Sequence, residues 1–388
     1  MEASELQGWL RLGLTDGVGD VTARTLLQRF GLPEAIFQAT EAELSGCVTA
    51  RQAQALLRVP DGLAHLLEST LQWLQDDPSR RRILTLGDAD YPAALLDTED
   101  PPLMLYAMGR VDGLANHFAR CASTGIAIVG SRNPTPQGVQ NARQFAEALG
   151  QAGLTVVSGL ALGIDGAAHE GALTGYASSG LATIAVVGTG LDRVYPKSHR
   201  DLAHQICGHG LLLSEYPLGT PPLSANFPKR NRIISGLCKG TLVVEAALKS
   251  GSLITARLAV EQGKDVFAIP GSIHATQARG CHALIKQGAK LVESAEDILE
   301  ELDLGAVAHP AVDASGHGEP HSSPAESSLS SLEMGLLDSM GFDPCGLDAI
   351  QARSGMDTAT LQALLMGLEL AGWVARLPGG KFQRLGRC

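Results

Sequence analysis

The chain has 388 residues, enough for two or three domains, and its 45% hydrophobic and 18% charged residues are typical of a globular protein. It contains no uninterrupted apolar stretch of the roughly 18 residues that a membrane span needs, and it begins without a secretory signal, so we expect a cytoplasmic protein. Thirty basic and 41 acidic residues give a formal charge of −11, which argues against wrapping in nucleic acid and confines any such site to a local patch.

The composition divides the chain into three folded parts and a linker. Residues 1–82 contain amphipathic helical patterns and are expected to form a helical domain, and residues 83–302 alternate strand and helix signals. Residues 303–329 are rich in Pro, Gly, Ser and His without apolar periodicity, which predicts a flexible linker. Residues 330–388 are then a separate C-terminal domain.

The N-terminal part begins with a predicted helix-hairpin-helix over residues 6–31. The turn is Gly17-Val18-Gly19, and in such hairpins glycine lets backbone N–H groups approach a phosphate. Asp16 and Asp20 flank the turn and no lysine is near it. We therefore slightly favour a hairpin that only stabilises a helical bundle.

The middle part repeats a short apolar run that ends in Gly or Ser and is followed by a helical stretch. This alternation predicts an α/β fold, a doubly wound parallel sheet covered on both faces, with its Gly- and Ser-rich turns along one edge. The runs are IAIVGSR (126–132), TVVSGLALG (155–163), TIAVVGTGL (183–191), LLLSEYP (211–217), TLVVEAALKSGS (241–252) and VFAIPGS (266–272).

The turns of this predicted sheet do not carry a nucleotide-binding motif. The first turn reads GSRNPTPQG in place of GxGxxG, and the second strand ends in Ser158-Gly159 where a ribose-binding acid is expected. No GxxxxGK[ST] sequence occurs. A dinucleotide site and a P-loop are therefore not indicated.

Basic residues at this edge indicate an anion of another kind. Arg132 follows the first strand, and a basic strip in residues 196–234 contains Lys197, Arg200, Lys229, Arg230 and Arg232 against Asp201 and Glu215. Basic side chains beside Ser- and Gly-rich turns suit a polyphosphate backbone read without regard to sequence. Tyr195, Tyr216 and Phe227 are interleaved and could stack on unpaired bases, although for Phe227 we favour a core position.

The same strings resemble the DprA/Smf family of DNA-processing proteins. The resemblance covers most of residues 83–291 and includes seven ordered motifs: IAIVGSRNPTPQG, VSGLALGIDGAAHEGAL, TIAVVGTGLDRVYP, LLSEYPLGTPPLSANFPKRNRIISGL, LVVEAALKSGSLITARLA, VFAIPGSI and GCHALIKQGA. It implies an extended Rossmann-like, mainly parallel domain that binds single-stranded DNA, forms a homodimer and loads the RecA recombinase during natural transformation and recombination. It also implies no catalytic activity and no cofactor.

Carried over by position, the resemblance implies a set of DNA contacts. Arg132, Lys197 and Arg230 are the expected phosphate clamps, while Asn231 and Arg232 could instead brace the loop. Leu162 departs from the polar or basic residue of many relatives. The implied contacts are Ser131, Arg132, Ser158, Gly159, Lys197, Phe227, Lys229, Arg230, Asn231, Arg232, Lys249, Ser250, Gly251 and Ser252.

Two enzyme readings have weaker support. Asp165 and His169 are four residues apart, hence on one helical face, and with Glu170 they could form an acid/base or metal cluster, but an Asp at a helix start is more often a cap. The alternative function is a nucleotide-binding hydrolase of the Rossmann-like phosphoribohydrolase type, in which Asp192, Glu215 and Glu245 would activate water. Its loop motif is matched only loosely.

Metal and disulfide chemistry are not indicated by the sequence. Its seven cysteines are scattered without a Cys-x-x-Cys pair, and we expect buried or free thiols. No cluster of acids at metal-ligand spacing appears, so we expect no metal site.

The last part of the middle domain is the expected partner surface. Residues 273–291 mix apolar residues with His282, and the resemblance favours a homodimer that uses His282, Ile285 and Leu291. The surface for RecA is not placed by the sequence.

The C-terminal part is predicted to be a winged helix, with three helices followed by a hairpin about Pro378-Gly379-Gly380. Its third helix has no Lys or Arg between Asp357 and Trp373. We therefore favour a protein-contact or regulatory role, or at most DNA contacts from the wing through Arg376, Lys381 and Arg384.

Overall fold

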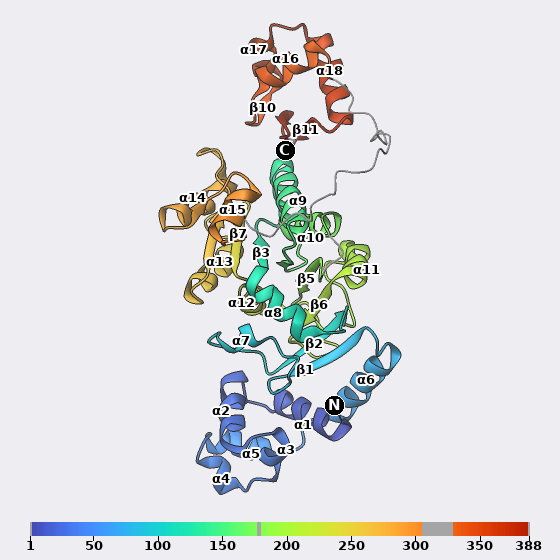
Figure 1. Ribbon diagram of the computed structural model, residues 1–388, viewed down its shortest axis with the longest axis vertical. Helices are drawn as coiled ribbons and strands as arrows, with labels where there is room; N and C mark the ends of the chain where they lie inside the picture. Colours follow the sequence, from blue (N-terminus) through green and yellow to red (C-terminus); the bar gives the residue numbers. More distant parts are fainter. Residues whose placement is uncertain (1, 177–179, 305–328, 387–388) are drawn as a thin grey trace, which may run out of the picture.

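The computed structural model describes residues 2–176, 180–304 and 329–386, which form three parts along one long axis (Figure 1). N-terminal helices lie at one end, a large sheet lies in the middle and a small helical domain lies at the other end. The predicted linker falls almost entirely outside the described residues. Among the helices that are described, none has both the length and the apolar character to cross a membrane.

The N-terminal part is helical, as the sequence predicts. The expected hairpin consists of α1 and α2, and Gly17 adopts a left-handed φ of +74° in the turn between them. Thr40 and Thr49 begin α4 and α5 with reciprocal capping boxes to Glu43 and Gln52. The helices are α1 (Ala3–Leu14), α2 (Asp20–Phe30), α3 (Pro33–Gln38), α4 (Glu41–Ser45), α5 (Ala50–Leu57) and α6 (Leu63–Asp76).

The middle part is built on a nine-stranded sheet of order β1-β2-β6-β5-β4-β3-β7-β8-β9. The strands from β6 to β9 in this order are parallel, and β1 and β2 add an antiparallel edge. This confirms the predicted mainly parallel sheet. The strands are β1 (Arg81–Thr85), β2 (Met104–Gly109), β3 (Ile126–Val129), β4 (Val156–Ser158), β5 (Thr183–Val186), β6 (Leu211–Ser214), β7 (Gly240–Val243), β8 (Asp265–Ala268) and β9 (Lys290–Leu291).

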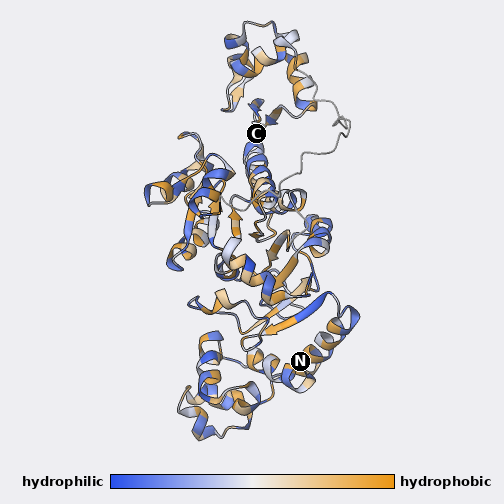
Figure 2. Cartoon of the chain, in the orientation of Figure 1, coloured by the Kyte–Doolittle hydropathy of each residue, from blue (hydrophilic) through white to orange (hydrophobic). Residues whose placement is uncertain are grey.

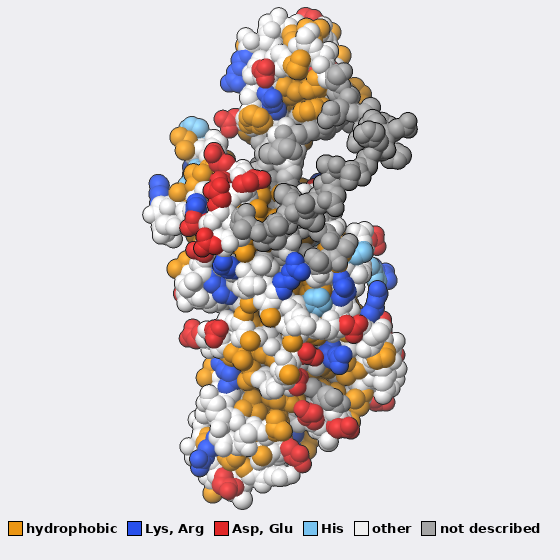
Figure 3. Space-filling view, in the orientation of Figure 1, with side chains coloured by type: hydrophobic (Ala, Val, Ile, Leu, Met, Phe, Trp, Pro, Cys, Tyr) orange, Lys and Arg blue, Asp and Glu red, His pale blue; other side chains and the backbone are white. Residues whose placement is uncertain are grey.

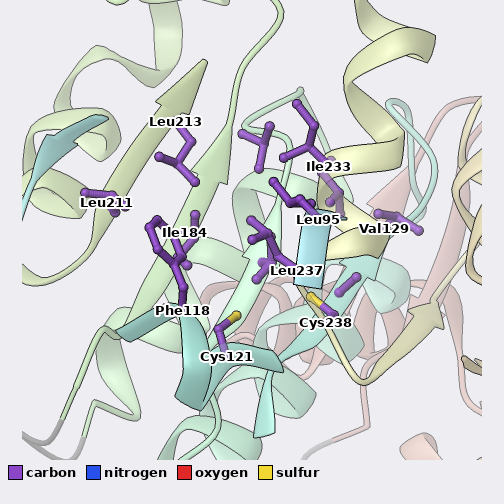
Figure 4. Close-up of a cluster of buried hydrophobic side chains, with 14 of the residues drawn as sticks. Leu95, Phe118, Cys121, Val129, Ile184, Leu211, Leu213, Ile233, Leu237 and Cys238 are labelled. Atoms are coloured by element: carbon purple, nitrogen blue, oxygen red, sulfur yellow. The ribbon is translucent and has the colours of Figure 1, made fainter. Parts of the chain in front are cut away.

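Helices cover both faces of this sheet, which explains why its central strands are apolar on both sides (Figure 2). One core lies between the sheet and α8, α12 and α13, and it contains Phe118, Ile184 and Ile233 (Figure 4). The other lies beneath α9, α10 and α15. The helices are α7 (Ala93–Leu96), α8 (Leu114–Thr124), α9 (Pro136–Gln151), α10 (Ile164–Thr174), α11 (Arg200–His209), α12 (Asn226–Gly236), α13 (Ser252–Glu261), α14 (Arg279–Lys286) and α15 (Ala295–Glu301).

The strand order places a topological switch point between β3 and β7. From β3 the chain proceeds through β4 and β5 to β6 on one side, and from β7 through β8 to β9 on the other. The loops at the carboxyl ends of β3 and β7 therefore separate and leave a crevice, which is where open α/β sheets bind their ligands.

The C-terminal part is the predicted winged helix. Its three-stranded sheet has the order β10-β12-β11. It lies near the N-terminal end of α9, where the Gly386 N–H donates to Gln137 Oε1 over 2.8 Å and the Gly386 carbonyl accepts from Gln140 (Figure 1). Its elements are α16 (Ser331–Met340), β10 (Cys345–Gly346), α17 (Leu347–Ser354), α18 (Thr358–Leu370), β11 (Val374–Leu377) and β12 (Lys381–Arg384).

Candidate nucleic-acid interface

A groove of about 780 Å³ occupies the crevice at the switch point. Its walls are the turn after β3, the first turns of α12 and the turn that leads into α13. These three segments are far apart in the sequence, and the sheet brings them together. Nine of the expected contacts line the groove: Ser131, Arg132, Phe227, Arg230, Asn231, Lys249, Ser250, Gly251 and Ser252.

Arg230 lies at the base of the groove with its side chain almost fully buried, only 4% exposed. Its Nη1 donates to the Val186 carbonyl over 2.8 Å, and its Nη2 lies 3.8 Å from Asp165 Oδ2. Its buried Nε has no hydrogen-bond partner within the described residues. Burial lowers the pKa of Arg230 and raises that of Asp165, and each charge partly offsets the effect on the other. Because Arg230 lines the groove, its guanidinium brings positive charge to the base, which favours an anion there.

Gly159 gives Arg230 its space. A Cβ at position 159 would lie 1.7 Å from Nη1 of Arg230 and 1.9 Å from Nη2. No side chain fits beside the guanidinium. Position 159 must therefore be glycine for Arg230 to pack where it does. Gly159 affects the groove by holding Arg230 in place, without lining the groove itself.

The mouth of the groove combines exposed cations with aromatic rings. Arg132 and Lys249 are exposed and form no ion pair with other described residues. The Arg132 guanidinium lies 5.4 Å from the ring centroid of Phe227, and the rings of Phe227 and Tyr195 lie 5.7 Å apart. Phe227 is only half-buried, and Tyr195 is 49% exposed. Both rings also line an adjoining recess of about 60 Å³ that includes Leu162.

The N-terminus of α13 forms another wall. Ser250 and Ser252 share a hydrogen bond of 2.7 Å between their hydroxyls, and the Asn231 amide donates to the Gly251 carbonyl over 3.4 Å. The N–H groups of a first helical turn have no partner within the helix, so this wall presents the positive end of the α13 dipole to the groove.

Five expected contacts do not line the groove, and Ser158 and Lys197 are two of them. Ser158 is fully buried at the end of β4, and its hydroxyl donates to the Ile128 carbonyl over 2.6 Å. Lys197 is exposed in a short 3₁₀ helix, Lys197–His199, which follows Tyr195 and Pro196 of the adjoining recess. Ser158 thus braces β3 and β4, and Lys197 lies on the approach to the recess.

Lys229 and Arg232 point away from the groove and towards the N-terminal part. Lys229 Nζ lies 2.6 Å from Asp20 Oδ2, directly after the hairpin turn. Arg232 forms a bidentate pair with Glu215, at 2.8 and 2.6 Å, and its Nε lies 3.2 Å from Asp100. Burial is the largest single effect on the pKa of Arg232 and lowers it, but the bond to Glu215 and the charges of Glu215, Asp100 and Asp20 together make the net shift upward. This network joins the hairpin to α12.

Some groove residues were not anticipated from the sequence. Asn133, Pro222, Ser224 and Thr255 also line it. Thr255 lies three residues after Ser252 on α13, and the helical period places both on one face. That spacing could have identified Thr255, whereas no local signal identifies Pro222 or Ser224.

The acids considered for hydrolysis all have partners within the chain. Asp192 accepts from the Gly219 N–H over 2.8 Å and pairs with Arg193, and Glu215 holds Arg232. Glu245 accepts from the N–H and hydroxyl of Thr135; burial raises the pKa of Glu245, and these bonds oppose the rise.

The structure places His169 and five of the six described cysteines in the protein interior, while Cys47 is partly exposed. His169 Nδ1 lies 2.7 Å from the Thr183 hydroxyl, and burial lowers the pKa of His169 to about 3, so the ring is neutral. Within the described residues no group of three His, Cys, Asp or Glu side chains could hold a metal ion, and the six described cysteines are free thiols.

The expected dimer residues surround β9, the last strand of the sheet. Leu291 is 44% exposed, and Ile285 is partly buried against the core. His282 Nε2 lies 2.9 Å from the Gly271 carbonyl.

The winged helix presents an apolar third helix. Met366 and Leu370 of α18 are 64% and 81% exposed. In the wing, Arg384 pairs with Asp338 over 3.0 Å, whereas Arg376 and Lys381 are exposed.

Comparison with known proteins identifies relatives of the whole arrangement. The family model of DNA recombination-mediator protein A matches residues 82–303, and that of the DprA winged helix domain matches residues 320–380. Protein Smf of Escherichia coli is 40% identical over 96% of this chain and 94% of its own length.

Two solved structures are similar to this one. DNA processing protein A of Streptococcus pneumoniae, at 37% identity, covers 78% of this chain and 98% of its own, with a TM-score of 0.63. The protein of the same name from Helicobacter pylori, described for its single-stranded DNA binding mode, covers 57% and 95% at 31% identity and a TM-score of 0.50.

Proposed function

Because this chain belongs to the family of DNA recombination-mediator protein A, we propose that it binds single-stranded DNA in the groove between β3 and β7 and loads the RecA recombinase onto that strand. In this role it binds without catalytic turnover and needs no cofactor. The proposal concerns the whole chain because the relative from Escherichia coli aligns over almost all of it.

The buried guanidinium of Arg230 is the observation that carries the DNA proposal. Its positive charge lies at the base of the groove, and the exposed side chains of Arg132 and Lys249 lie at the mouth. Three cations around one groove match consecutive phosphates better than a single small anion.

The aromatic pair at the mouth favours a single strand over a duplex. Tyr195 and Phe227 present partly exposed rings beside Arg132, and only unpaired bases have a free face to stack on them. The Helicobacter pylori relative, with its described single-stranded DNA binding mode, supports the same ligand.

A titration of fluorescent oligo-dT and matched duplex at several salt concentrations tests the proposal. With three phosphate contacts, log K should fall against log salt with a slope of about −2, and Arg132→Ala should weaken binding and reduce that slope by about 0.7. Arg82→Ala is the matched control because Arg82 is exposed on β1, far along the sheet from the groove. Equal effects of the two variants, or a preference for duplex, would contradict the proposal.

We also propose a homodimer through β9 and α14. The open edge of the sheet and the exposed side chains of Leu291 and Ile273, the latter 73% exposed, support this surface. Light scattering during gel filtration should give twice the chain mass, and Leu291→Arg should give a monomer. Val21→Arg, at an apolar position of α2 that is 66% exposed, should leave the dimer intact.

The RecA proposal is supported by family membership, and the apolar face of α18 supports a protein-contact role for the winged helix. The assay is RecA filament assembly on oligo-dT that is already covered by a single-stranded-DNA-binding protein. Wild type should accelerate assembly, and Arg132→Ala should do so only at higher protein concentration. No acceleration at saturating wild-type protein would refute loading.

A further inference from the structure

The first helix after the switch-point strand β3 is α9, which has sixteen residues. In doubly wound folds the phosphates of a bound nucleotide rest on the N-terminus of this helix, because its N–H groups and dipole favour an anion. In this chain the position is already filled.

The group that fills it is the carboxylate of Glu245, which comes from the segment after β7 on the other side of the switch point. Its Oε2 accepts from the Thr135 N–H over 2.9 Å, and its Oε1 accepts from the Thr135 hydroxyl over 2.6 Å. Thr135 is the N-cap of α9. An internal anion thus occupies the place of a ligand phosphate.

The fit is too close for a second anion. A Cβ at position 138 would lie 2.5 Å from the carboxyl carbon of Glu245, so the carboxylate packs directly against the first turn of α9. The donors of that turn are also largely used. Pro136 has no N–H, the Gly138 N–H donates to the Thr135 hydroxyl, and the Val139 N–H donates to the Thr135 carbonyl.

We propose that Glu245 is a specificity-determining residue that closes the nucleotide-phosphate position of this fold and leaves only the neighbouring groove for a ligand. The groove is bounded by residues 130–133, which lie just before Thr135, and by residues 247–252, which lie just after Glu245. The bonds between Thr135 and Glu245 join these two loops. Free nucleotides are thereby excluded while the polynucleotide site stays open. The inference uses the proposed function only for the ligand of that neighbouring groove.

The test measures binding of inorganic pyrophosphate and of ADP by calorimetry, with oligo-dT binding measured on the same samples. Wild type should bind neither small anion in the presence of saturating oligo-dT, which occupies the neighbouring groove. Glu245→Ala removes the internal anion and opens space, and should bind pyrophosphate and ADP at least tenfold more tightly than wild type. Glu245→Gln fills the same space without charge and should resemble wild type.

Glu245→Ser also removes the carboxylate but keeps a small polar side chain, and serves if the Ala variant does not fold; it should show the same gain. Binding of pyrophosphate or ADP by wild type that oligo-dT does not displace, or no gain in a folded Ala or Ser variant, would overturn the inference. A gain in the variant together with no oligo-dT binding by wild type would uphold the role of Glu245 and refute the proposed function.

Discussion

The contact between Gly159 and Arg230 allows a sharp test of how the groove is built. In Gly159→Ala the new methyl group would lie 1.7 Å from Nη1 of Arg230, and the guanidinium would have to retreat by about 1.7 Å to reach ordinary contact at 3.4 Å. Such a shift breaks its 2.8 Å bond to the Val186 carbonyl and removes the nearest positive charge from Asp165. The variant should therefore lose both stability and DNA affinity.

The magnitude follows from the burial of the pair. Arg230 and Asp165 are 4% and 7% exposed, and removing one partner of a buried ion pair typically costs about 3–5 kcal/mol because the other charge stays uncompensated. We expect Gly159→Ala to lower the free energy of unfolding by about that amount. Arg230→Ala should cost a similar amount, since it leaves the same carboxylate alone.

A double-mutant cycle separates this mechanism from a general intolerance of alanine at position 159. Without the guanidinium the methyl group has room, so Gly159→Ala in an Arg230→Ala background should cost less than about 1 kcal/mol. Urea unfolding followed by circular dichroism, with amide exchange in β5 as the local probe, gives the four free energies. Equal costs in both backgrounds would show that the guanidinium does not set the requirement for glycine.

Two other predictions concern buried charge and the domain contact. The pKa of His169 is about 3 in the folded chain and 6.5 when unperturbed, so the unfolded chain binds the extra proton first as pH falls. The stability that neutral His169 contributes is complete above pH 6.5 and is lost between pH 6.5 and 3, at up to about 1.4 kcal/mol per pH unit. In His169→Gln the urea midpoint should therefore depend less steeply on pH over that range than in wild type. Asp20→Asn breaks a partly exposed pair with Lys229, so it should cost at most about 1 kcal/mol and leave the oligo-dT affinity unchanged within about twofold. A loss of affinity comparable to that of Arg132→Ala would place the hairpin in the DNA site.

The run Phe227 to Arg232 shows how far the sequence could lead. Its composition correctly indicates a basic segment, and the sheet pattern places it at the ligand edge. On α12, however, successive residues point about 100° apart, so neighbouring cations diverge. Arg230 faces the groove, while Lys229 and Arg232 face acids of the N-terminal part and of distant loops.

The partners of those cations could not be predicted locally. Asp20 and Asp100 lie more than a hundred residues before Arg232, and only the packing of the hairpin against α12 brings them together. Ser158 illustrates the same limit within a strand. A Ser at the end of a strand suggests a ligand contact, but its hydroxyl is turned inward to the Ile128 carbonyl. Strand alternation decides this orientation once the sheet register is known.

The charge of −11 is compatible with a polyanionic ligand because the excess acid lies elsewhere. Asp and Glu side chains cluster on α15, and Figure 3 shows acidic groups gathered over that part of the molecule. At physiological ionic strength a charge is screened beyond about 8 Å, so acids farther than that from the groove act weakly on DNA in it. Asp20 and Glu215, the acids that face α12, are neutralised by Lys229 and Arg232. The cations that face the groove, with Arg132 and Lys249 at its mouth, therefore set the local potential that a phosphate meets.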